Sequence, residues 1–303
     1  MPTTLAQIGE FGFIDLIKKK MKVSSHVIRG IGDDAAVVKV AKDKLLLLAT
    51  DMLLEGVHFT RQMSSTGIGH KAMGCNISDI AAMGGTPSYA LVSLGIPGKI
   101  SLSFIRGIYE GMQSLARGYG ISIVGGDTIK SNKIIINVAL IGEAKKENIV
   151  LRSGAKAGDW IFVTGPLGKS FVTKWHLQFS PRLKESRYLV KNFKPTAMID
   201  VSDGLAADLG HILEESRAGA VLEEVKIPRR KKASLQEALC DGEDFELVFT
   251  LPKKSAEKLL KVSNPFPFYW IGEIVKGREG GPLQLKDQKG RCRLFPKKGF
   301  VHF

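Results

Sequence analysis

The sequence predicts an α/β (α+β) protein of two domains, and three observations support this prediction. The chain has 303 residues, of which 44% are hydrophobic and 24% charged, so it is long enough to bury more than one core. In both halves, segments with helical spacing alternate with short apolar runs typical of strands. The polar stretch 143–148 lies between the halves, so we expect one domain over residues 1–145 and a second over 149–303.

The N-terminal half is predicted to contain three helices and five strands. Apolar residues at three- and four-residue spacing predict helices over 5–21, 67–83 and 101–117. Short apolar segments predict strands at 36–40, 45–49, 89–96, 121–124 and 134–142. Gly84 and Gly85 end the second helix. Asp51 and Asp127 each follow a predicted strand, and strand ends commonly carry functional residues.

The C-terminal half is predicted to continue the alternation. Strands are expected at 160–164, 221–225, 245–250 and 269–275, and helices up to about residue 193, through residue 213 and over 253–262. Ser202 or Asp203 can cap the helix that ends at residue 213. Asp200 precedes that cap, so capping does not explain it.

Composition excludes several classes of protein. The longest apolar runs, 45–50 and 134–142, are too short to cross a bilayer, and the N-terminus lacks a basic-then-apolar leader. Cys75, Cys240 and Cys292 form neither a metal-type spacing nor an evident disulfide framework. We therefore expect a cytoplasmic protein.

The formal net charge of +14 has more than one explanation. Its densest basic clusters lie within 226–232 and 286–298. Clustered lysine and arginine suit nucleic-acid binding, but neither cluster carries the interleaved aromatic residues of a single-strand platform. A solvated basic face is the favoured interpretation, and excess positive charge also suits an enzyme with anionic phosphate substrates.

Asp79 is out of place in the helix predicted over 67–83. Aspartate is a poor helix former, and this one lies near the C-terminal end, where the helix dipole disfavours an anion. Its apolar neighbours suggest a poorly hydrated setting in which the carboxylate needs a cation. The alternative is a solvated polar face shared with His70, Lys71 and Ser78. Asp79 alone leaves both interpretations open.

Two glycine-rich segments resemble nucleotide-binding loops but fail on their context. Residues 30–35 match Gly-x-Gly-x-x-Ala, yet a strand follows where the dinucleotide fingerprint needs a helix. The adjacent Asp33 and Asp34 make this loop a candidate metal site instead. Residues 164–170 nearly match the phosphate-loop pattern Gly-x-x-x-x-Gly-Lys-Ser. Val163 stands where that pattern requires its first glycine, so we reject a P-loop.

Six short motifs occur in a specific order along the chain. They are Asp33-Asp34, Thr50-Asp51 followed by His58, Asn76-x-Ser78-Asp79, Gly125-Gly126-Asp127-Thr128, Asp200-x-Ser202-Asp203-Gly204 and Gly242-Glu243-Asp244-Phe245-Glu246. With Gly-Glu-Phe-Gly at 9–12 and Gly-Phe-Val-His-Phe at 299–303, they resemble the thiamine-monophosphate kinase family. That family belongs to the superfamily sharing the aminoimidazole ribonucleotide synthetase fold. The resemblance covers nearly the whole chain.

The resemblance implies a PurM-like fold, with an N-terminal domain whose strands pair across a homodimer and a C-terminal α/β domain. It implies direct transfer of the ATP γ-phosphoryl group to thiamine monophosphate with a Mg²⁺ cluster, and no nucleic-acid or membrane partner. Mg²⁺ prefers oxygen ligands and bridges anionic substrates that otherwise repel each other, which suits the aspartate motifs.

The resemblance also assigns residues by position. The implied Mg²⁺ ligands are Asp34, Thr50, Asp51, Asp79, Asp127, Asp200 and Asp203, of which Asp51, Asp79 and Asp127 are the expected catalytic residues. The implied ATP contacts are Tyr109, Gly126, Asp127, Arg152 and Ser202. The implied contacts with the thiamine moiety are His58, Glu243 and Phe300.

The chain departs from the family pattern in three places. Ala49 replaces a frequent Ser or Thr, Asp241 adds a negative charge beside Gly242, and 194–199 joins segments that the family separates by roughly a helix. Two rival functions stay open. One is that of another ATP-using, synthetase-type member of the superfamily, and the other is a basic nucleic-acid-binding protein, which the aspartate array disfavours.

Overall fold

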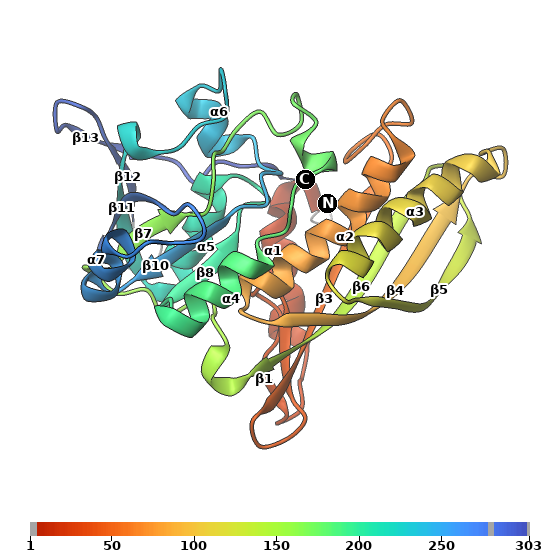
Figure 1. Cartoon of the computed structure of the whole chain (residues 1–303), viewed down its shortest axis with the longest axis horizontal. Coiled ribbons are helices and arrows are strands. Elements are labelled where there is room, and N and C mark those ends of the chain that lie inside the picture. Colours follow the sequence, from red (N-terminus) through yellow and green to blue (C-terminus); the bar gives the residue numbers. More distant parts are fainter. Residues whose placement is uncertain (1–4, 278–281, 302–303) are drawn as a thin grey trace.

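The computed structural model describes residues 5–277 and 282–301, so His302 and Phe303 of the closing motif lie outside the described residues. The fold is mixed α/β and is built around two sheets, as Figure 1 shows. This confirms the predicted fold class. Among the described residues, none of the helices combines the length and the apolarity that crossing a bilayer requires.

The N-terminal sheet has six strands in the order β1-β2-β3-β6-β4-β5. Their bounds are β1 (Val27–Arg29), β2 (Ala36–Lys39), β3 (Lys44–Leu54), β6 (Ile135–Lys145), β4 (Thr86–Ile96) and β5 (Ser122–Lys130). All neighbours are antiparallel except β4 and β5, which are parallel. The apolar residues of alternate strand positions bury one face of this sheet, as the period of two requires.

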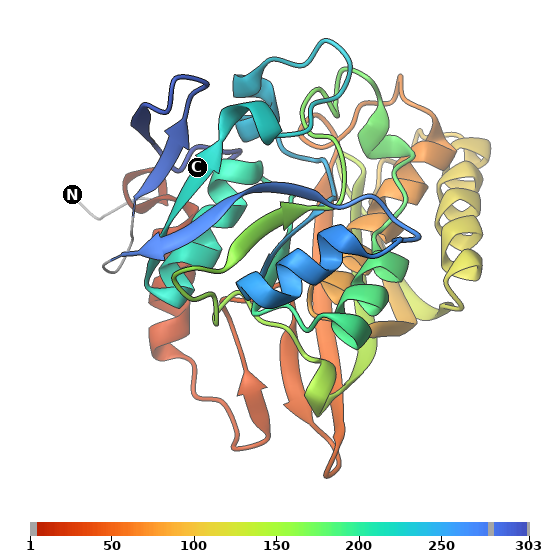
Figure 2. The same ribbon diagram turned by 60° about the vertical axis from the view of Figure 1, so that its left-hand side comes forward.

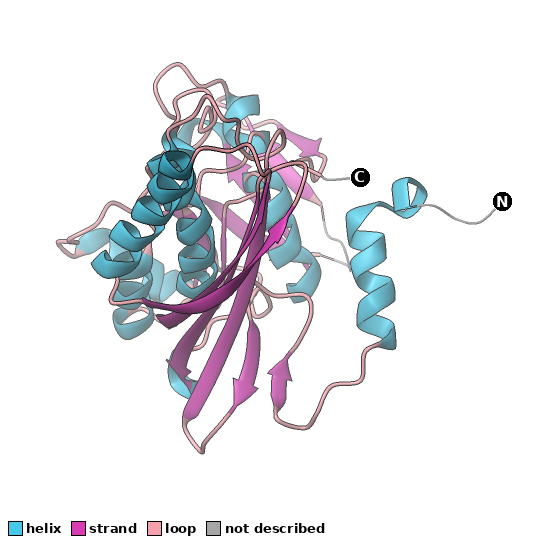
Figure 3. Ribbon diagram, turned by 90° about the vertical axis from the view of Figure 1, so that its right-hand side faces the viewer, coloured by secondary structure: helices cyan, strands magenta, loops and turns pink. Residues whose placement is uncertain are grey.

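Helices α2 (Ser65–Ala82) and α3 (Leu102–Gly118) cover the buried face of the N-terminal sheet (Figure 1). The two helices approach closely because Gly69 has no side chain, and a Cβ there would lie 1.8 Å from the Ile108 carbonyl oxygen. Ser64 caps the start of α2, and Gly84, with φ of 72°, ends it as predicted. Helix α1 (Leu5–Lys20) stands apart from the sheet (Figure 3).

The C-terminal sheet has seven strands in the order β13-β12-β9-β11-β7-β10-β8. Their bounds are β13 (Cys292–Phe295), β12 (Leu283–Lys286), β9 (Ala218–Glu223), β11 (Tyr269–Lys276), β7 (Trp160–Val163), β10 (Leu247–Leu251) and β8 (Ala197–Asp200). Neighbours are antiparallel except β9 and β12.

Helices cover both faces of the C-terminal sheet. One core contains residues of α5 (Leu205–Ser216) and α6 (Leu235–Cys240), and the other contains residues of α4 (Leu183–Asn192) and α7 (Lys253–Lys261). Figure 2 shows α4 and α7 on the near side of the sheet. Three short 3₁₀ helices complete the described elements, η1 (Lys146–Asn148), η2 (Trp175–Leu177) and η3 (Glu224–Lys226).

Several predicted bounds were wrong, and the site depends on two of them. Strand β3 continues through Asp51 to Leu54, and β5 continues through Asp127 to Lys130, because both strands keep pairing with their neighbours there. Neither aspartate therefore follows a strand end. The region before residue 193 is helical only in η2 and α4. Lys169 and Lys174 have φ of 57° and 59°, which a continuous helix does not allow.

Candidate active site

A cleft made of two adjoining cavities, of about 680 and 930 Å³, separates α2 and β3 from the C-terminal segment 200–203. Both cavities are lined by the same seven residues, which therefore mark their junction: Thr50, Asp51, Asp79, Asp200, Ser202, Asp203 and Phe300. All seven are site residues predicted from the sequence. The fold thus brings motifs that lie 150 residues apart in the chain to one place.

The centre of the cleft is a cluster of three carboxylates. Asp34 precedes β2, Asp79 lies near the end of α2, and Asp200 ends β8. One oxygen from each lies within 4.8 Å of the others. The Ser78 hydroxyl donates to Asp200 Oδ2 at 2.6 Å, and Arg152 Nη2 donates to Asp34 Oδ1 at 2.6 Å. Asp34 Oδ2 is buried without a hydrogen-bond partner among the described residues.

Burial and mutual repulsion disfavour the charged form of these three carboxylates. Burial first, and then the charges of Asp51, Asp200 and Asp34, raise the pKa of Asp79 well above its ordinary value. Burial and neighbouring carboxylates raise the pKa of Asp200 in the same direction. A divalent cation would relieve both the repulsion and the lost hydration. Three converging carboxylate oxygens with one unsatisfied acceptor therefore fit a hard cation such as Mg²⁺.

Asp51 and Thr50 lie beside this cluster on β3. Burial raises the pKa of the Asp51 carboxyl to about 6, and a hydrogen bond with Asp79 opposes that rise. Thr50 Oγ1 donates to the Val138 carbonyl of β6 at 3.2 Å. Its main chain pairs with β6, and its side chain lines both cavities. Ala49, where the family often has a hydroxyl, is buried in the N-terminal core.

The start of α5 differs from the capping expected for Ser202 or Asp203. Gly204 occupies the N-cap position without a side-chain hydrogen bond. Instead, Asp208 Oδ2, one turn into the helix, accepts the backbone N–H groups of Asp203 at 3.1 Å and Gly204 at 3.0 Å. Capping by Ser202 or Asp203 was therefore wrong. Asp208 takes that role, and Ser202 and Asp203 line the cleft.

The three residues expected to contact thiamine line the smaller cavity together. The backbone N–H of Leu54 donates to His58 Nδ1 at 2.9 Å, and the Phe300 ring lies 6.4 Å from the His58 ring between centroids. Glu243 reaches the same cavity from the C-terminal loop 241–246, where it pairs with Lys71 of α2. The structure therefore brings these three residues to one cavity, and their contact with thiamine stays a prediction.

Three of the site residues predicted from the sequence lie outside the cleft of this chain. Gly126 and Asp127 are exposed on the edge strand β5, and Tyr109 is exposed on α3. None of them lines either cavity. Asp51 lies opposite Val138, Val138 opposite Val92, and Val92 opposite Gly126. Three strand spacings, roughly 14 Å, therefore separate β3 from β5, too far for Asp51 and Asp127 of one chain to share an ion.

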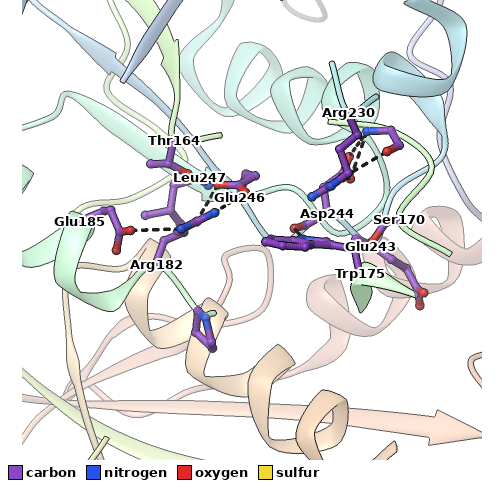
Figure 4. Close-up of polar contacts among 12 residues, drawn as sticks. Thr164, Ser170, Trp175, Arg182, Glu185, Arg230, Glu243, Asp244, Glu246 and Leu247 are labelled. Atoms are coloured by element: carbon purple, nitrogen blue, oxygen red, sulfur yellow. Dashed lines mark hydrogen bonds and ion pairs between the residues drawn. The ribbon is translucent and has the colours of Figure 1, made fainter. Parts of the chain in front are cut away.

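Loop 241–246 carries four acidic residues, and three of them, Glu243, Asp244 and Glu246, each pair with a basic side chain of the protein. Figure 4 shows two of these pairs, Arg230–Asp244 and Arg182–Glu246. Glu243 pairs with Lys71. Asp244 pairs with Arg230 and also accepts the Gly168 N–H at 3.1 Å. Glu246 accepts Arg182 Nη2 at 2.6 Å and Nε at 2.7 Å. Arg230, which we had assigned to a solvated basic face, instead has a side chain that is 11% exposed.

Sequence analysis missed Lys71 and Asp208. Lys71 was assigned with Ser78 to a possible solvated face of α2, but both are buried, so that alternative was wrong. An ion pair 172 residues apart leaves no local pattern. For Asp208, an acid in the first turn of a predicted helix was a usable signal.

Comparisons with known proteins agree with this geometry. The AIR synthase related protein models match in two parts, the N-terminal domain over residues 32–144 and the C-terminal domain over 124–283. A thiamine-monophosphate kinase from Buchnera aphidicola is 35% identical, covering 94% of this chain and 96% of the relative. One from Aquifex aeolicus is also 35% identical, covering 99% of each. The chain belongs to the thiamine-monophosphate kinase family.

A solved structure of this kinase family agrees over the whole fold. It is described as AaThiL complexed with AMPPCP and TMP, has a TM-score of 0.86 and 34% identity, and covers 100% of both chains. The alignment with the Aquifex thiamine-monophosphate kinase spans 328 positions, more than the 303 residues of this chain, so the relative carries insertions. The predicted position of the shortening, at 194–199, stays a prediction.

Proposed function

We propose that this chain transfers the γ-phosphoryl group of ATP to thiamine monophosphate, giving thiamine diphosphate and ADP. The observation that carries the proposal is the junction of two cavities at an aspartate cluster, with His58, Glu243 and Phe300 in the cavity beside it. The smaller cavity, here called the acceptor cavity, suits thiamine monophosphate, and the larger cavity suits ATP. The acceptor phosphate and the γ-phosphate of ATP would then meet at the aspartate cluster. Relatives named thiamine-monophosphate kinase support the choice of acceptor.

The residues of the chain suggest a role for each side of the cleft. Asp34, Asp79 and Asp200, with Asp51, Thr50 and Asp203 nearby, would hold Mg²⁺, which neutralises the phosphates when bound. The Glu243 carboxylate matches the positive thiazolium, and the Phe300 ring offers it an aromatic face. Arg152, which lines the larger cavity and pairs with Asp34, would orient that carboxylate and contact ATP.

The chemistry needs no general base. A phosphomonoester has a second pKa of about 6, so at neutral pH the attacking oxygen is already largely ionised. That oxygen bonds to the γ-phosphorus while the bond to the β,γ-bridging oxygen breaks, and ADP leaves with the electron pair. The protein holds the two substrates in line and excludes water. His58 therefore positions the acceptor and does not remove a proton.

The test is product formation by the purified chain with ATP and Mg²⁺. Thiamine monophosphate, thiamine and an aminoimidazole precursor are offered in parallel, and ADP and thiamine diphosphate are quantified by chromatography. We expect one thiamine diphosphate per ADP, with thiamine monophosphate alone. ATP turnover with the aminoimidazole precursor and none with thiamine monophosphate would establish the synthetase-type rival.

We also propose that the working form is a homodimer. The outer face of the N-terminal sheet exposes apolar side chains, among them Leu48, Met52, Leu91 and Ile129 at 42%, 59%, 46% and 60%. A second copy would cover this face. It would also bring Gly126, Asp127 and Tyr109 of one chain toward the cleft of the other. Asp127 could then act in a cleft although β3 and β5 of one chain are three strand spacings apart.

Mixed dimers test this arrangement. Asp79→Asn and Asp127→Asn, each inactive alone, are unfolded together and refolded as an equal mixture. If Asp127 serves the partner's site, half of the dimers are mixed and each regains one intact site, so about a quarter of wild-type activity returns. No recovered activity in refolded dimers would place Asp127 in its own chain's site, and an active Asp127→Asn variant would place it outside any site.

The remaining assignments follow the same proposal. The N-terminal division over 1–145 and the C-terminal division over 149–303 are supported by the two sheets, whose strands come from residues up to 145 and from 160 onward. The partners would be ATP, thiamine monophosphate and a second copy, in the cytoplasm and without nucleic acid. The Arg230–Asp244 pair supports this, since it assigns one residue of the densest basic cluster to an internal contact.

A further inference from the structure

Lys71 is a buried cation at the meeting point of the two halves of the acceptor cavity. Its side chain is 1% exposed, yet it lines that cavity from the second turn of α2. Burying an ammonium group is costly unless partners replace its water. Lys71 has two such partners, the His58 carbonyl oxygen at 2.9 Å and the Glu243 carboxylate.

These two partners belong to opposite sides of the cleft. His58 follows β3 of the N-terminal sheet, and Glu243 lies in the loop before β10 of the C-terminal sheet. The same Nζ atom therefore fixes two of the three residues expected to contact the thiamine moiety. Its position is itself rigid because α2 is packed against α3 and the sheet.

The Glu243 backbone is also held at a fixed position. Its φ of 54° lies in the left-handed region, which costs a non-glycine residue energy and persists only when other contacts impose it. The Glu243 N–H donates to the Ser202 carbonyl at 2.6 Å, and the Ser170 hydroxyl donates to the Glu243 carbonyl. The side-chain contact with Lys71 completes this restraint.

The two oxygens of the Glu243 carboxylate differ. Oε1 accepts Lys71, whereas Oε2 is buried and has no hydrogen-bond partner among the described residues. His176 Nδ1 lies 3.4 Å from Oε2, but burial and the charge of Lys71 lower the His176 pKa to about 3. His176 is therefore neutral at physiological pH and supplies no second cation.

We propose that Lys71 is a positioning residue for the acceptor. By holding Glu243 Oε1 and the His58 carbonyl, it fixes both sides of the acceptor cavity in one geometry, so that the Glu243 carboxylate keeps its place beside the cationic substrate. This inference rests on the proposed function. It differs from a charge-balance role, in which removing Lys71 would make the cavity more negative and would strengthen binding of a cation.

Four variants test the inference: Lys71→Met, Glu243→Gln, the double variant, and Lys169→Met as a control. Lys169 is a matched lysine that pairs with Glu237 at 3.5 Å outside both cavities. For each, KM for thiamine monophosphate, KM for ATP, kcat and the unfolding temperature are measured. Should Lys71→Met fail to fold, the double variant, which removes both charges, is compared with Glu243→Gln.

We expect Lys71→Met to raise KM for thiamine monophosphate tenfold or more, about 1.4 kcal/mol, while KM for ATP stays within twofold. Because Lys71 acts largely through Glu243, the double variant should lie close to Glu243→Gln and far below the product of the single effects. Equal rises in both KM values, a lower KM for thiamine monophosphate, or multiplicative effects would overturn the proposal.

The same variants separate this inference from the proposed function. If the wild type binds thiamine monophosphate without phosphorylating it, the proposed function is wrong, and dissociation constants from calorimetry replace KM in the same comparison. If the wild type does not bind thiamine monophosphate at all, both proposals are overturned.

Discussion

Two groups of acidic residues, those of loop 241–246 and those of the cleft, have opposite kinds of neighbours. In loop 241–246, Glu243, Asp244 and Glu246 each pair with a basic side chain, namely Lys71, Arg230 and Arg182. In the cleft, Arg152 pairs with Asp34, whereas Asp200 is held by the neutral hydroxyl of Ser78 and Asp79 faces other carboxylates.

The neighbours of each carboxylate show the same difference. Burial raises the pKa of Asp244 to about 7, and Arg230 opposes that rise. Burial also raises the pKa of Asp79, but there Asp51, Asp200 and Asp34 add to the rise. The three loop carboxylates thus have their cations within the protein, whereas none of the described residues forms an ion pair with Asp79 or Asp200, which supports the proposed cation site.

The largest effect should come from removing one charge of the cleft cluster. Asp79→Asn keeps the shape of the side chain but lowers its value as a metal ligand, so kcat should fall by a thousandfold or more, about 4 kcal/mol of barrier. The assay is single-turnover phosphoryl transfer at saturating Mg²⁺, with circular dichroism as the fold control. Near-normal turnover in a folded variant would remove the cluster from the reaction.

Breaking a pair of the loop should instead cost stability. Arg182→Met leaves the Glu246 carboxylate buried without its cation, a change that typically costs about 3–5 kcal/mol. Urea unfolding of Arg182→Met should show this loss. Arg187→Met, on the exposed side of α4, is the control and should change stability by less than about 0.5 kcal/mol. Similar losses of stability for both variants would mean that the Arg182–Glu246 pair stabilises the fold no more than an exposed arginine does.

His58 lines the same cavity as Asp79 and Glu243, so its replacement sharpens the comparison. His58→Asn can keep an acceptor for the Leu54 N–H, so we expect roughly a tenfold rise in KM for thiamine monophosphate, about 1.4 kcal/mol. The acid limb of the kcat profile against pH should stay in place. Loss of that limb together with a thousandfold fall in kcat would instead identify His58 as a general base.

The smallest effect is expected at Lys169, the lysine of the rejected phosphate loop. Its side chain is 26% exposed and forms a loose ion pair with Glu237, of the kind that contributes little. Lys169→Ala should therefore leave KM for ATP within twofold. A tenfold rise would show that this segment binds phosphate despite Val163.

The difference between the two acidic groups also explains what the sequence could predict. Gly84 ends α2 where expected, so the core helix could be predicted from local pattern, and the aspartates that line the cleft stand in short motifs whose order resembles the family. The ion pairs of the loop join residues between 14 and 172 positions apart, and no local pattern indicates them.

Two other errors have physical causes. Asp51 and Asp127 look like strand-end residues because aspartate is rare inside strands, yet continued pairing with neighbouring strands holds both within β3 and β5. Lys71 looks like a residue of a solvated helix face because a single lysine among apolar residues gives no sign of a distant carboxylate partner.

The central claim is that the cleft carboxylates form a cation site that the protein itself leaves uncompensated. The most direct test is the unfolding temperature of the wild type and Asp79→Asn, with and without Mg²⁺, in the absence of nucleotide and at constant ionic strength. The account predicts that Asp79→Asn is at least as stable as the wild type without Mg²⁺, because repulsion is relieved, and that Mg²⁺ raises the unfolding temperature of the wild type alone. An equal rise in both proteins, or none in the wild type, would contradict it.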